Sequence, residues 1–568
     1  MFGKYLVKNL GGFRRYSTGR KATYKIIGIS SAVFVTGFLT GTGYMMYSTL
    51  NNVPAFLFPL SSKTELKDLS SPQYIDVRFE VDKFDDELRR IVASDDVSTS
   101  ENDIDTHSFN NYTLHKPSPE QRPHVIVYPR STEHVSQIMK LCHKYRVPVI
   151  PFSGGTSIEG QFVTTRNKGR SQCSCSDPTI TLVLDFNRHM NNVLQVNADD
   201  MDCVVQPGVV TKELNDNILE PLGLIFGPDG APGCEIGGQI GTSCSGTNAY
   251  RYGTMKENVI NVTAVMADGT IIKTKNRPKK SSNGYNLTGL FIGSEGTLGV
   301  ITEATIKLHV KPIYETISIV SFPTLQDATK LVQRLNKMGI NNINAVELLD
   351  GNMMKAINFS GQTARVWDEN PTLLFKIGSH SKNILKETIK DVGDLAYQQG
   401  CITFESAKTI SQQEELWSAR KSIFWSSIDY GRHLFGENVK IWSTDIAVPI
   451  SKLPNVIDET LAEIIGSGLY GTIVGHVGDG NFHCLVMYDD ETEQKAMQLI
   501  DSMNYRALKN EGTCSGEHGI GISKRKFLEL ELGTDTISVM RKIKMALDSQ
   551  RIMNPDKLFK IDPRDNKD

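Results

Sequence analysis

The sequence predicts an α+β protein whose main domain holds a large, extended cofactor. Three glycine-rich loops recur in one stretch of chain: Ser153–Ser157 (SGGTS), Phe226–Asn258 and Ile292–Thr302 (IGSEGTLGVIT). Runs with the alternating apolar pattern of strands lie between them. Glycine lets the backbone press against a ligand, and free N–H groups between the glycines bind anions. One such loop would be an ordinary turn, whereas three in one domain favour a cofactor.

The overall composition excludes some classes of protein. A length of 568 residues implies several domains, and a net charge of −2 argues against a nucleic-acid partner. Nine cysteines at scattered spacings form neither a disulfide framework nor the CxxC pairs of zinc sites. Cys173 and Cys175 lie in a polar run, Arg166–Pro178, that we interpret as a surface insertion, with a redox role as the alternative.

Residues 1–25 are typical of a mitochondrial presequence. They contain seven basic residues, and no acidic residue occurs before Glu65. The run Arg14-Arg15-Tyr16-Ser17 resembles a matrix-protease cleavage site.

Residues 26–47, IIGISSAVFVTGFLTGTGYMMY, are predicted to form a transmembrane helix. The stretch carries no charge and reaches the ~20 residues needed to cross a bilayer. Its many Gly, Ser and Thr residues leave a signal remnant or a buried segment as alternatives. Basic residues precede the span and none follows until Lys63. This asymmetry predicts an inner-membrane anchor with the catalytic part in the intermembrane space.

Two regions with different predicted secondary structure follow the predicted transmembrane helix. Residues 48–121 are expected to form a tether and a helical region. Residues 122–311 alternate strands, such as ITLVLDF, CVVQPG and LGVITEATIKL, with a helix capped by Ser131 or Thr132.

After Lys311 the glycine density falls. Residues 312–535 mix strand-like runs, such as NAVELLD and TLLFKIG, with amphipathic helices, such as LQDATKLVQRLNKM. The final part, residues 536–568, begins with a predicted helix over Thr536–Met553.

The order of these motifs resembles a known flavoprotein family. PFSGGTS, VVQPG, the long glycine stretch and GSEGTLGVITEATIKL resemble the vanillyl-alcohol oxidase/p-cresol methylhydroxylase type, within it the D-2-hydroxyacid dehydrogenase branch. The resemblance spans roughly Arg122 to Phe559. It implies a two-part FAD-binding domain (122–311), a C-terminal α+β substrate or cap domain (312–535), and a C-terminal segment that returns to the FAD domain.

The resemblance also implies non-covalent FAD, with its pyrophosphate at Ser153–Ser157. That loop has no histidine to tether a flavin, and no GxGxxG opens a helix after the first strand, so a Rossmann site is not indicated. A plain helix stop before Pro555 explains Asn554 as well as a cofactor contact does. The expected cofactor-binding residues are Ser153, Gly154, Gly155, Thr156, Ser157, Pro228, Asp229, Gly238, Thr242, Ser245, Gly246, Ile301 and Asn554.

The segment VGHVGDGNFHCLV (Val474–Val486) predicts a pair of metal ligands. Asp479-Gly480 is a two-residue hairpin signal, which makes residues whose numbers sum to 959 face each other, among them His476 and His483. Opposed residues have Cβ atoms about 4.5–5.5 Å apart, so both imidazoles can reach one metal at about 2.0–2.1 Å. For either histidine alone, a structural role is the alternative.

The motif CSGEHGIG (Cys514–Gly521) offers a third ligand and a base. Successive side chains seldom enter one site together, so Glu517 and His518 should have separate roles. The resemblance implies that Glu517 completes the metal site and that His518 is the general base. The metal remains open among Zn, Mn, Fe and Co, with Zn or Mn expected. Its charge should lower the pKa of His518, leaving a neutral imidazole that accepts a proton.

Arg420 and Lys440 are candidates for substrate binding. Trp417, Arg420 and Phe424 share a helix face by their spacing. A cation there needs a partner, and a substrate carboxylate, bound bidentately, or a protein carboxylate would serve. The family has an arginine at the matching position in its substrate site. Lys440, before IWSTD, is a further candidate of the same kind.

The resemblance and the topology together imply a function. The expected reaction is FAD- and metal-dependent oxidation of D-lactate, or a similar small D-2-hydroxy acid, with cytochrome c as electron acceptor. A D-2-hydroxyglutarate dehydrogenase shares every motif, but requires extra cations for the second carboxylate and a matrix acceptor. Alternatives from other classes are a flavin-free 2-His-1-carboxylate iron oxygenase and a non-catalytic tethered flavoprotein.

Overall fold

The computed structural model describes residues 61–565, apart from residues 78, 111, 112, 114, 116, 118–120 and 165–178. The presequence, the transmembrane helix expected over residues 26–47 and the Arg166–Pro178 insertion therefore lie outside the described residues. None of the helices within the described ranges is both long and apolar enough to cross a membrane.

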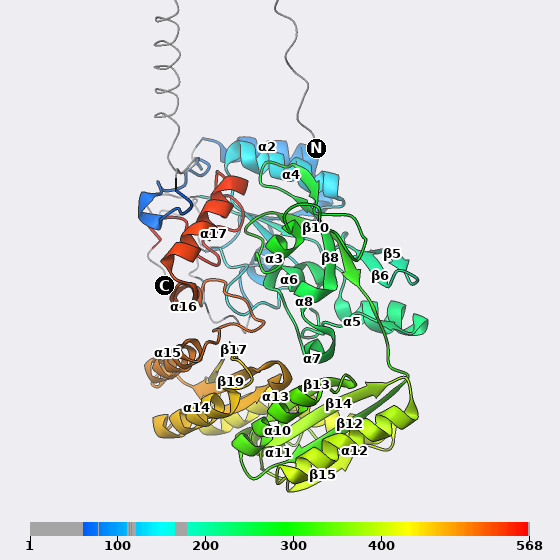
Figure 1. Ribbon diagram of the computed structural model, residues 1–568. Helices are drawn as coiled ribbons and strands as arrows, with labels where there is room; N and C mark the ends of the chain where they lie inside the picture. The colour runs from blue at the N-terminus through cyan, green and yellow to red at the C-terminus, as the bar shows by residue number, and fades with distance from the viewer. Residues whose placement is uncertain are drawn as a thin grey trace, which may run out of the picture. The chain divides into compact units, whose positions relative to one another are not determined.

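Two sheets build the first part of the fold (Figure 1). One has the strand order β1–β2–β4–β3, with β2 and β3 both parallel to β4. The other is antiparallel, in the order β5–β6–β10–β8–β9. The strands are β1 (Val97–Ser98), β2 (Val125–Val127), β3 (Val149–Phe152), β4 (Leu182–Asp185), β5 (Val193–Asn197), β6 (Asp202–Val205), β8 (Val259–Val265), β9 (Ile271–Lys273) and β10 (Val300–Lys307).

Short helices cover these sheets. The helix predicted after Ser131 is confirmed as α4 (Thr132–Tyr145), and the Ser131 side chain accepts a hydrogen bond from the His134 N–H. It packs with α2 (Val81–Ile91) over the four-stranded sheet and shares one apolar core with it. The remaining elements here are α3 (Glu101–Thr106), α5 (Thr211–Glu213), α6 (Ile236–Thr242), α7 (Ala249–Tyr252), α8 (Met255–Asn258), α9 (Leu287–Phe291) and the pair β7 (Leu224–Ile225) and β11 (His309–Val310).

The second part is built on one large antiparallel sheet, in the lower half of Figure 1. Its order is β15–β12–β14–β13–β18–β19–β16, and β17 also pairs with β19. The strands are β12 (Tyr314–Ser321), β13 (Ile343–Leu349), β14 (Thr372–Ser379), β15 (Thr403–Ser406), β16 (Lys440–Ser443), β17 (Ile446–Ala447), β18 (Tyr470–Gly475) and β19 (Asn481–Tyr488). The predicted strands NAVELLD and TLLFKIG are confirmed as β13 and β14.

Helices cover both faces of this sheet. One core holds the sheet together with α10 (Leu325–Met338), α12 (Lys382–Gln398), α14 (Leu453–Ser467) and α15 (Glu493–Lys509). On the opposite face the core is shared with α11 (Gly351–Ser360) and α13 (Ile410–Phe435). The strands are therefore buried on both sides, which explains their nearly continuous apolar runs.

The last helix ends earlier than predicted. After α16 (Arg525–Leu532), α17 spans Thr534–Leu547, not Thr536–Met553. The Asp548 carboxylate accepts the N–H groups of Ile552 (3.1 Å) and Met553 (2.8 Å), and Met553 forms a bridge to Val149 of β3. The apolar pattern outlasts the helix because Ile552 and Met553 are buried against the first sheet.

The connection between β18 and β19 corrects the predicted hairpin. Val474, not His476, lies opposite His483, so the paired numbers sum to 957 rather than 959. The N–H groups of Asp479 and Asn481 both donate to the His476 carbonyl, and residues 477–479 form a 3-10 turn. The turn thus forms around a wider loop than the Asp479-Gly480 signal predicts, and His476 belongs to that loop instead of the strand.

Candidate active site

A pocket follows the glycine-rich loops of the first part. Most of the residues predicted to bind the cofactor line it: Ser153, Gly154, Gly155, Thr156, Ser157, Gly238, Thr242, Ile301 and Asn554. The backbone N–H groups of residues 154–157 donate to no acceptor within the described part of the chain. Gly155 has φ +62°, a conformation that favours glycine. The loop is therefore free to bind an anion such as a pyrophosphate.

On the opposite wall of the pocket, Gly238 presents backbone without a side chain where a flat ligand would lie. A Cβ placed on Gly238 would find its nearest neighbour, the Ser153 Cβ, only at 3.7 Å, and would stand in the pocket. A side chain at Gly238 would thus compete with a ligand and not with the protein. This wall fits FAD, which needs close backbone approach along its length.

Four of the expected cofactor residues lie outside the pocket wall: Pro228, Asp229, Ser245 and Gly246. The Ser245 hydroxyl (2.7 Å) and the Gly246 N–H (2.9 Å) donate instead to Oε2 of Glu517. Asp229 accepts from the Asn248 N–H at 2.8 Å, which holds the same turn. The glycine-rich stretch therefore builds two structures, the pocket wall around α6 and a turn that supports Glu517, and glycine content alone does not separate them.

The pocket also contains residues that the sequence did not single out. Phe152, Gln161, Phe186, Glu235, Gln239 and Glu295 line it. Burial raises the pKa of Glu235 to about 7, and its Oε2 has no hydrogen-bond partner among the described residues. Four of them stand in or beside the glycine-rich loops, which was a signal: Phe152, Glu235, Gln239 and Glu295. Gln161 and Phe186 offered none, and tertiary packing brings them to the pocket.

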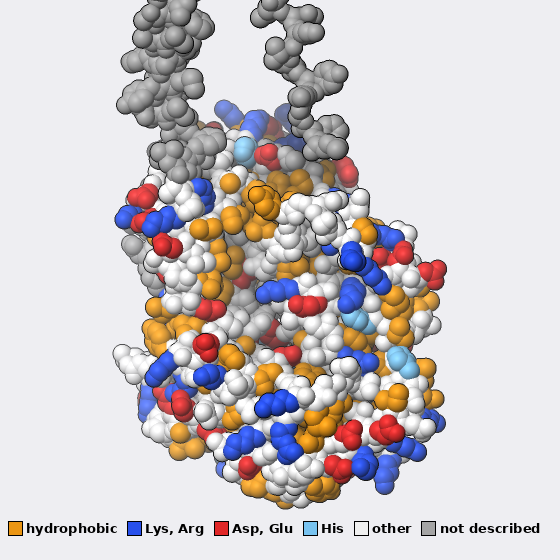
Figure 2. All heavy atoms as spheres, viewed as in Figure 1, with side chains coloured by type: hydrophobic (Ala, Val, Ile, Leu, Met, Phe, Trp, Pro, Cys, Tyr) orange, Lys and Arg blue, Asp and Glu red, His pale blue; other side chains and the backbone are white. Residues whose placement is uncertain are grey.

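His476, His483 and Glu517 converge, as predicted. Their candidate ligand atoms all lie within 4.8 Å of one another, and both imidazoles are buried. Oε1 of Glu517 lies 3.1 Å from Nε2 of His476 and 3.4 Å from Nε2 of His483. Figure 2 shows a recess between the two parts of the fold, with acidic side chains inside it. We call His476, His483 and Glu517 the triad.

Hydrogen bonds behind the triad orient both imidazoles. Nδ1 of His476 lies 2.8 Å from Oε1 of Glu347, and Nδ1 of His483 lies 2.9 Å from the Thr444 carbonyl oxygen. Because those acceptors take the Nδ1 protons, each Nε2 lone pair is left for a ligand. A carboxylate or carbonyl behind a metal-binding histidine is the usual arrangement at metal sites.

The triad fits a divalent metal ion. Ligands at ~2.0–2.2 Å from a metal lie ~2.8–3.6 Å apart in octahedral or tetrahedral geometry. Oε1 of Glu517 lies within this range of both Nε2 atoms. Burial opposes a charged His476, but the charges of Glu347 and Glu517 outweigh it and raise the pKa of His476 well above its usual range. The two carboxylates thus favour a positive charge at the triad.

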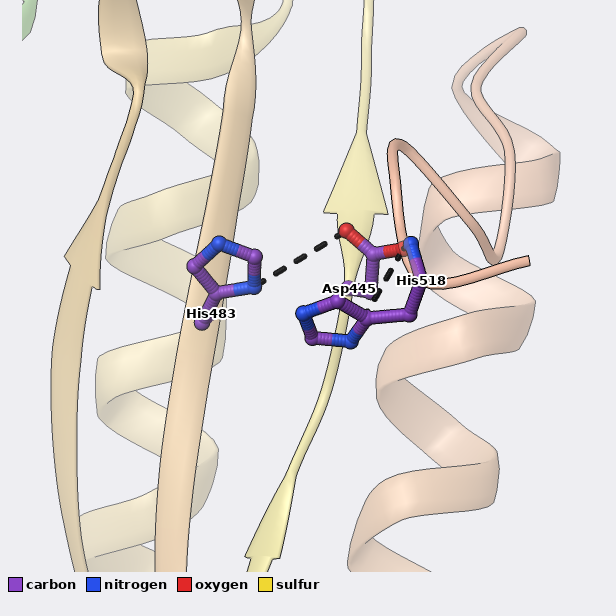
Figure 3. A group of neighbouring side chains, drawn as sticks. All are labelled: Asp445, His483 and His518. Carbon is purple, nitrogen blue, oxygen red and sulfur yellow. Dashed lines mark hydrogen bonds and ion pairs between the residues drawn. The ribbon is translucent and has the colours of Figure 1, made fainter. Parts of the chain in front are cut away.

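A second group of possible ligands, Asp445, His483 and His518, overlaps the triad (Figure 3). Nδ1 of His483, which faces Asp445 at 3.8 Å, already donates to the Thr444 carbonyl. Oδ2 of Asp445 accepts from the backbone N–H groups of Glu517 (2.9 Å) and His518 (2.7 Å). Asp445 therefore shapes the loop that carries both residues, and the triad is the better metal site.

His518 lies beside the triad without joining it. Its Nδ1 is 3.9 Å from Oδ2 of Asp445 and 4.0 Å from Oε1 of Glu159. Burial lowers the pKa of His518 to about 4, more than the Asp445 charge raises it, so the imidazole is neutral at pH 7. The sequence predicted a neutral His518 from the charge of a metal, whereas in the structure burial is the main cause, and the charges of His483 and Lys524 act in the same direction.

Arg420 on α13 reaches the site through a protein carboxylate. Its Nε donates to Oε2 of Glu347 at 2.7 Å, and Glu347 is completely buried. Neither Nη1 nor Nη2 has a hydrogen-bond partner within the described ranges. Burial raises the pKa of Glu347, but the charges of His476 and Arg420 outweigh it and hold that pKa below its ordinary value. Arg420 thus has a protein partner and two amino groups available for substrate.

Lys440 does not belong to this site, which corrects its prediction. Lys440 is the first residue of β16, and its Nζ forms ion pairs with Asp490 (2.6 Å) and Glu493 (3.2 Å). It lies opposite Tyr488, five residues along β19 from His483, or about 16 Å at the rise of a strand. The sequence placed Lys440 near IWSTD, but the strand carries it away from Asp445.

Two family models match the chain. A model described as "FAD binding domain" matches residues 123–275, and one described as "FAD linked oxidases, C-terminal domain" matches residues 311–558. The first match contains the loop Ser153–Ser157 and α6 of the pocket, and the second contains the triad.

Curated proteins and solved structures are also similar to this chain. The chain is 51% identical to "D-lactate dehydrogenase [cytochrome], mitochondrial" of Kluyveromyces lactis, over 89% of this chain and 86% of that protein. It is 49% identical to "D-lactate dehydrogenase [cytochrome] 1, mitochondrial" of Saccharomyces cerevisiae, over 89% and 85%. A substrate-bound p-cresol methylhydroxylase structure superposes with a TM-score of 0.66, at 15% identity, over 87% of this chain and 99% of the other. The expected vanillyl-alcohol oxidase/p-cresol methylhydroxylase fold is confirmed.

Proposed function

This chain belongs to the family of FAD-linked D-lactate dehydrogenases of the cytochrome type, and we propose that it oxidises D-lactate to pyruvate with FAD and a divalent metal ion. The observation that carries the proposal is the triad next to the glycine-lined pocket. Oε1 of Glu517 faces the Nε2 atoms of both histidines, while Gln161 lines the pocket and donates to the His518 carbonyl at 2.7 Å. The redox cofactor and the metal would thus share one active site.

The bound groups would supply two kinds of chemistry: FAD accepts the substrate's Cα hydrogen with its electron pair, and the metal acts as template and Lewis acid for a carboxylate and hydroxyl. Ser153–Ser157 and α6 would hold FAD, and the triad would hold Zn or Mn. The protein's own residues then bind the substrate, orient it and remove its hydroxyl proton.

Arg420 would bind the substrate carboxylate. Glu347 holds the Nε edge, so the guanidinium presents Nη1 and Nη2 in a fixed plane. A planar pair of donors matches a carboxylate. This fixes one end of a short 2-hydroxy acid and directs its hydroxyl toward the triad.

His518 would take the hydroxyl proton. Its neutral imidazole is the form that accepts a proton. With Nδ1 facing the Asp445 carboxylate, Nε2 is left for the substrate, and the charge of Asp445 would stabilise the imidazolium that forms. Deprotonating the hydroxyl favours release of the Cα hydrogen as a hydride.

A second candidate substrate, D-2-hydroxyglutarate, is favoured by one observation. Lys376 on β14 lies opposite Ala345, on the sheet face that carries Glu347. Its Nζ lies 4.8 Å from the centre of the Trp417 ring, and it forms no ion pair within the described part of the chain. This cation could meet a second carboxylate. With a shorter substrate, Lys376 would keep only its contacts with Trp417 and Asn248. The names of the relatives favour D-lactate.

We further propose that the enzyme is anchored in the mitochondrial inner membrane and reduces cytochrome c in the intermembrane space. The names of the curated relatives support a cytochrome acceptor and a mitochondrial location. The apolar run over residues 26–47 and the basic residues before it support the membrane anchor and its orientation.

The test is a substrate screen with purified holoenzyme. D-lactate, L-lactate and D-2-hydroxyglutarate are added without oxygen, and loss of oxidised-flavin absorbance is followed before and after chelation. We expect fast reduction by D-lactate, a strong loss of rate on chelation, and recovery with added Zn²⁺ or Mn²⁺. Preference for D-2-hydroxyglutarate would establish the second candidate, and full activity after complete metal removal would refute the metal. Reduction of added cytochrome c tests the acceptor in the same preparation.

A further inference from the structure

Glu347 uses its two oxygens for two different partners. Oε1 lies 2.8 Å from Nδ1 of His476, and Oε2 lies 2.7 Å from Nε of Arg420. A carboxylate that only neutralised Arg420 would normally use both oxygens on the guanidinium. Here the second oxygen is diverted to a histidine of the triad.

The fold places Glu347 between these partners. Leu348 of β13 pairs with Gly475 at the end of β18, which brings Glu347 beside His476 in the following loop. The side chain of Glu347 points to the sheet face covered by α13, the helix that carries Arg420. Strand pairing therefore supplies one contact and helix packing supplies the other.

The burial of Glu347 makes both contacts necessary. A fully buried carboxylate is costly unless each oxygen is paired, and none of the Glu347 side chain is exposed. It cannot rotate toward water to exchange partners. His476 is thus held with its proton on Nδ1 and its Nε2 toward Glu517, while Arg420 is held with Nη1 and Nη2 outward.

We propose that Glu347 is a positioning residue that couples the metal site to the substrate-carboxylate site. The inference rests on the proposed function, because it takes the triad as the metal site and Arg420 as the substrate's partner. It assigns the coupling to a residue that touches neither metal nor substrate. One substitution at Glu347 should therefore weaken metal binding and substrate binding together.

The experiment uses full-length FAD holoenzyme treated with a chelator and then titrated with Mn²⁺, with free Mn²⁺ measured directly. KM and kcat for D-lactate are measured at saturating Mn²⁺, which separates the effect on Arg420 from metal loss. We expect Glu347→Gln to weaken Mn²⁺ binding by ~10–100-fold, the usual effect of losing a group behind a ligand. KM should rise at saturating Mn²⁺, and flavin content should be unchanged.

Two further variants isolate the coupling. Arg420→Gln should raise KM and leave Mn²⁺ affinity as in the wild type, because His476 keeps its acceptor. Asp350→Asn is the matched control: it neutralises another buried carboxylate, which caps α11 through the Met353 N–H. It should change neither quantity.

Glu347→Gln leaves Arg420 without a counterion, which would destabilise the fold. The double variant Glu347→Gln/Arg420→Gln removes that unpaired cation and so separates loss of metal binding from misfolding. It should show the same loss of Mn²⁺ affinity as the single variant. A Glu347→Gln enzyme that changes only Mn²⁺ affinity, only KM, or neither would overturn the coupling. Failure of the wild-type enzyme to bind Mn²⁺ or Zn²⁺ at all would instead refute the proposed metal dependence, and this is measured on the wild type alone.

Discussion

The imidazole of His518 stacks on the imidazole of His483, with ring centres 5.0 Å apart and planes 12° from parallel. His483 directs its Nε2 to Glu517, whereas His518 directs its Nδ1 to Asp445 and Glu159. The two stacked histidines thus face different carboxylates. This contact lets a proposed metal ligand and a proposed base lie side by side while their roles remain separable by mutation.

That separation is the first prediction. Replacing His476, His483 or Glu517 by Ala removes one of three protein ligands, so metal content and D-lactate turnover should fall together. His518→Ala should keep metal and flavin while turnover falls by ~10²–10⁴, the usual contribution of a positioned acid–base group. Metal analysis, flavin absorbance and turnover of the four variants check this. If His518→Ala loses metal and Glu517→Ala keeps it, the two roles are exchanged.

The second prediction concerns the FAD pocket. Gly238→Val should abolish FAD binding and leave the protein folded, because the new side chain meets the pocket and not the protein. Gly155→Val should also lose FAD, but with some loss of stability, since its Cβ would lie 2.7 Å from the Phe152 ring at a positive φ. Gly466→Val, in an open position of α14, is the control. Wild-type flavin content in Gly238→Val would show that FAD does not lie along this wall.

The third prediction follows from the correction of Lys440. Lys440→Ala should leave kcat and KM for D-lactate within a factor of ~2, because it breaks only partly exposed ion pairs worth ~0–1 kcal/mol. Arg420→Gln should raise KM at least tenfold. Steady-state kinetics on both enzymes make the comparison. An increase in KM of similar size in Lys440→Ala would return Lys440 to the substrate site.

The fourth prediction concerns the segment that follows the expected membrane anchor. The Thr64 N–H donates to the Ser538 carbonyl at 3.2 Å, and Nη1 of Arg551 donates to the Ser70 carbonyl at 2.6 Å. Deleting residues 1–60 should leave a yellow, active enzyme free of membrane. Deleting residues 1–75 should lower the melting temperature and flavin content, because Arg551 lies next to the turn that carries Asn554 into the pocket.

Membrane extraction, flavin absorbance and thermal unfolding compare the two deletions. Equal flavin content and equal melting temperature in both would show that residues 61–75 do not support the cofactor-binding part. Membrane association that survives deletion of residues 1–60 would refute the expected anchor over 26–47.

The fifth prediction is a pH dependence of stability. Burial raises the pKa of Asp350 from 3.8 to about 7. Between these values the unfolded chain releases this proton while the folded protein keeps it, so the free energy of unfolding falls as pH rises and levels off above pH 7. Asp350→Asn lacks this ionisation. Its melting temperature relative to wild type should therefore rise from pH 4.5 to pH 7.5, and a constant difference would contradict the shift.

The candidate site could be predicted only in part from the sequence. Chemistry and spacing indicated His476 and His483, whereas the family resemblance assigned the roles of Glu517 and His518. The predicted route to their juxtaposition was wrong, because the turn forms on the His476 carbonyl and shifts the strand register. Glu347 gave no signal, since one glutamate within an apolar strand does not reveal that it meets both an arginine and a histidine.

Local chemistry by itself determined the elements of this protein: the cap on Ser131, the alternating strands, the glycine loops without side chains and the residue types that bind a metal. These depend on neighbours within a few positions along the chain. Tertiary structure alone decided which glycines face the pocket. It also decided that Lys440 of β16 lies beside the end of β19, away from His483, and that Glu347 lies between His476 and Arg420. Those outcomes depend on strand order and helix placement, which bring together residues far apart in the chain, such as Glu347 and His476, 129 positions apart.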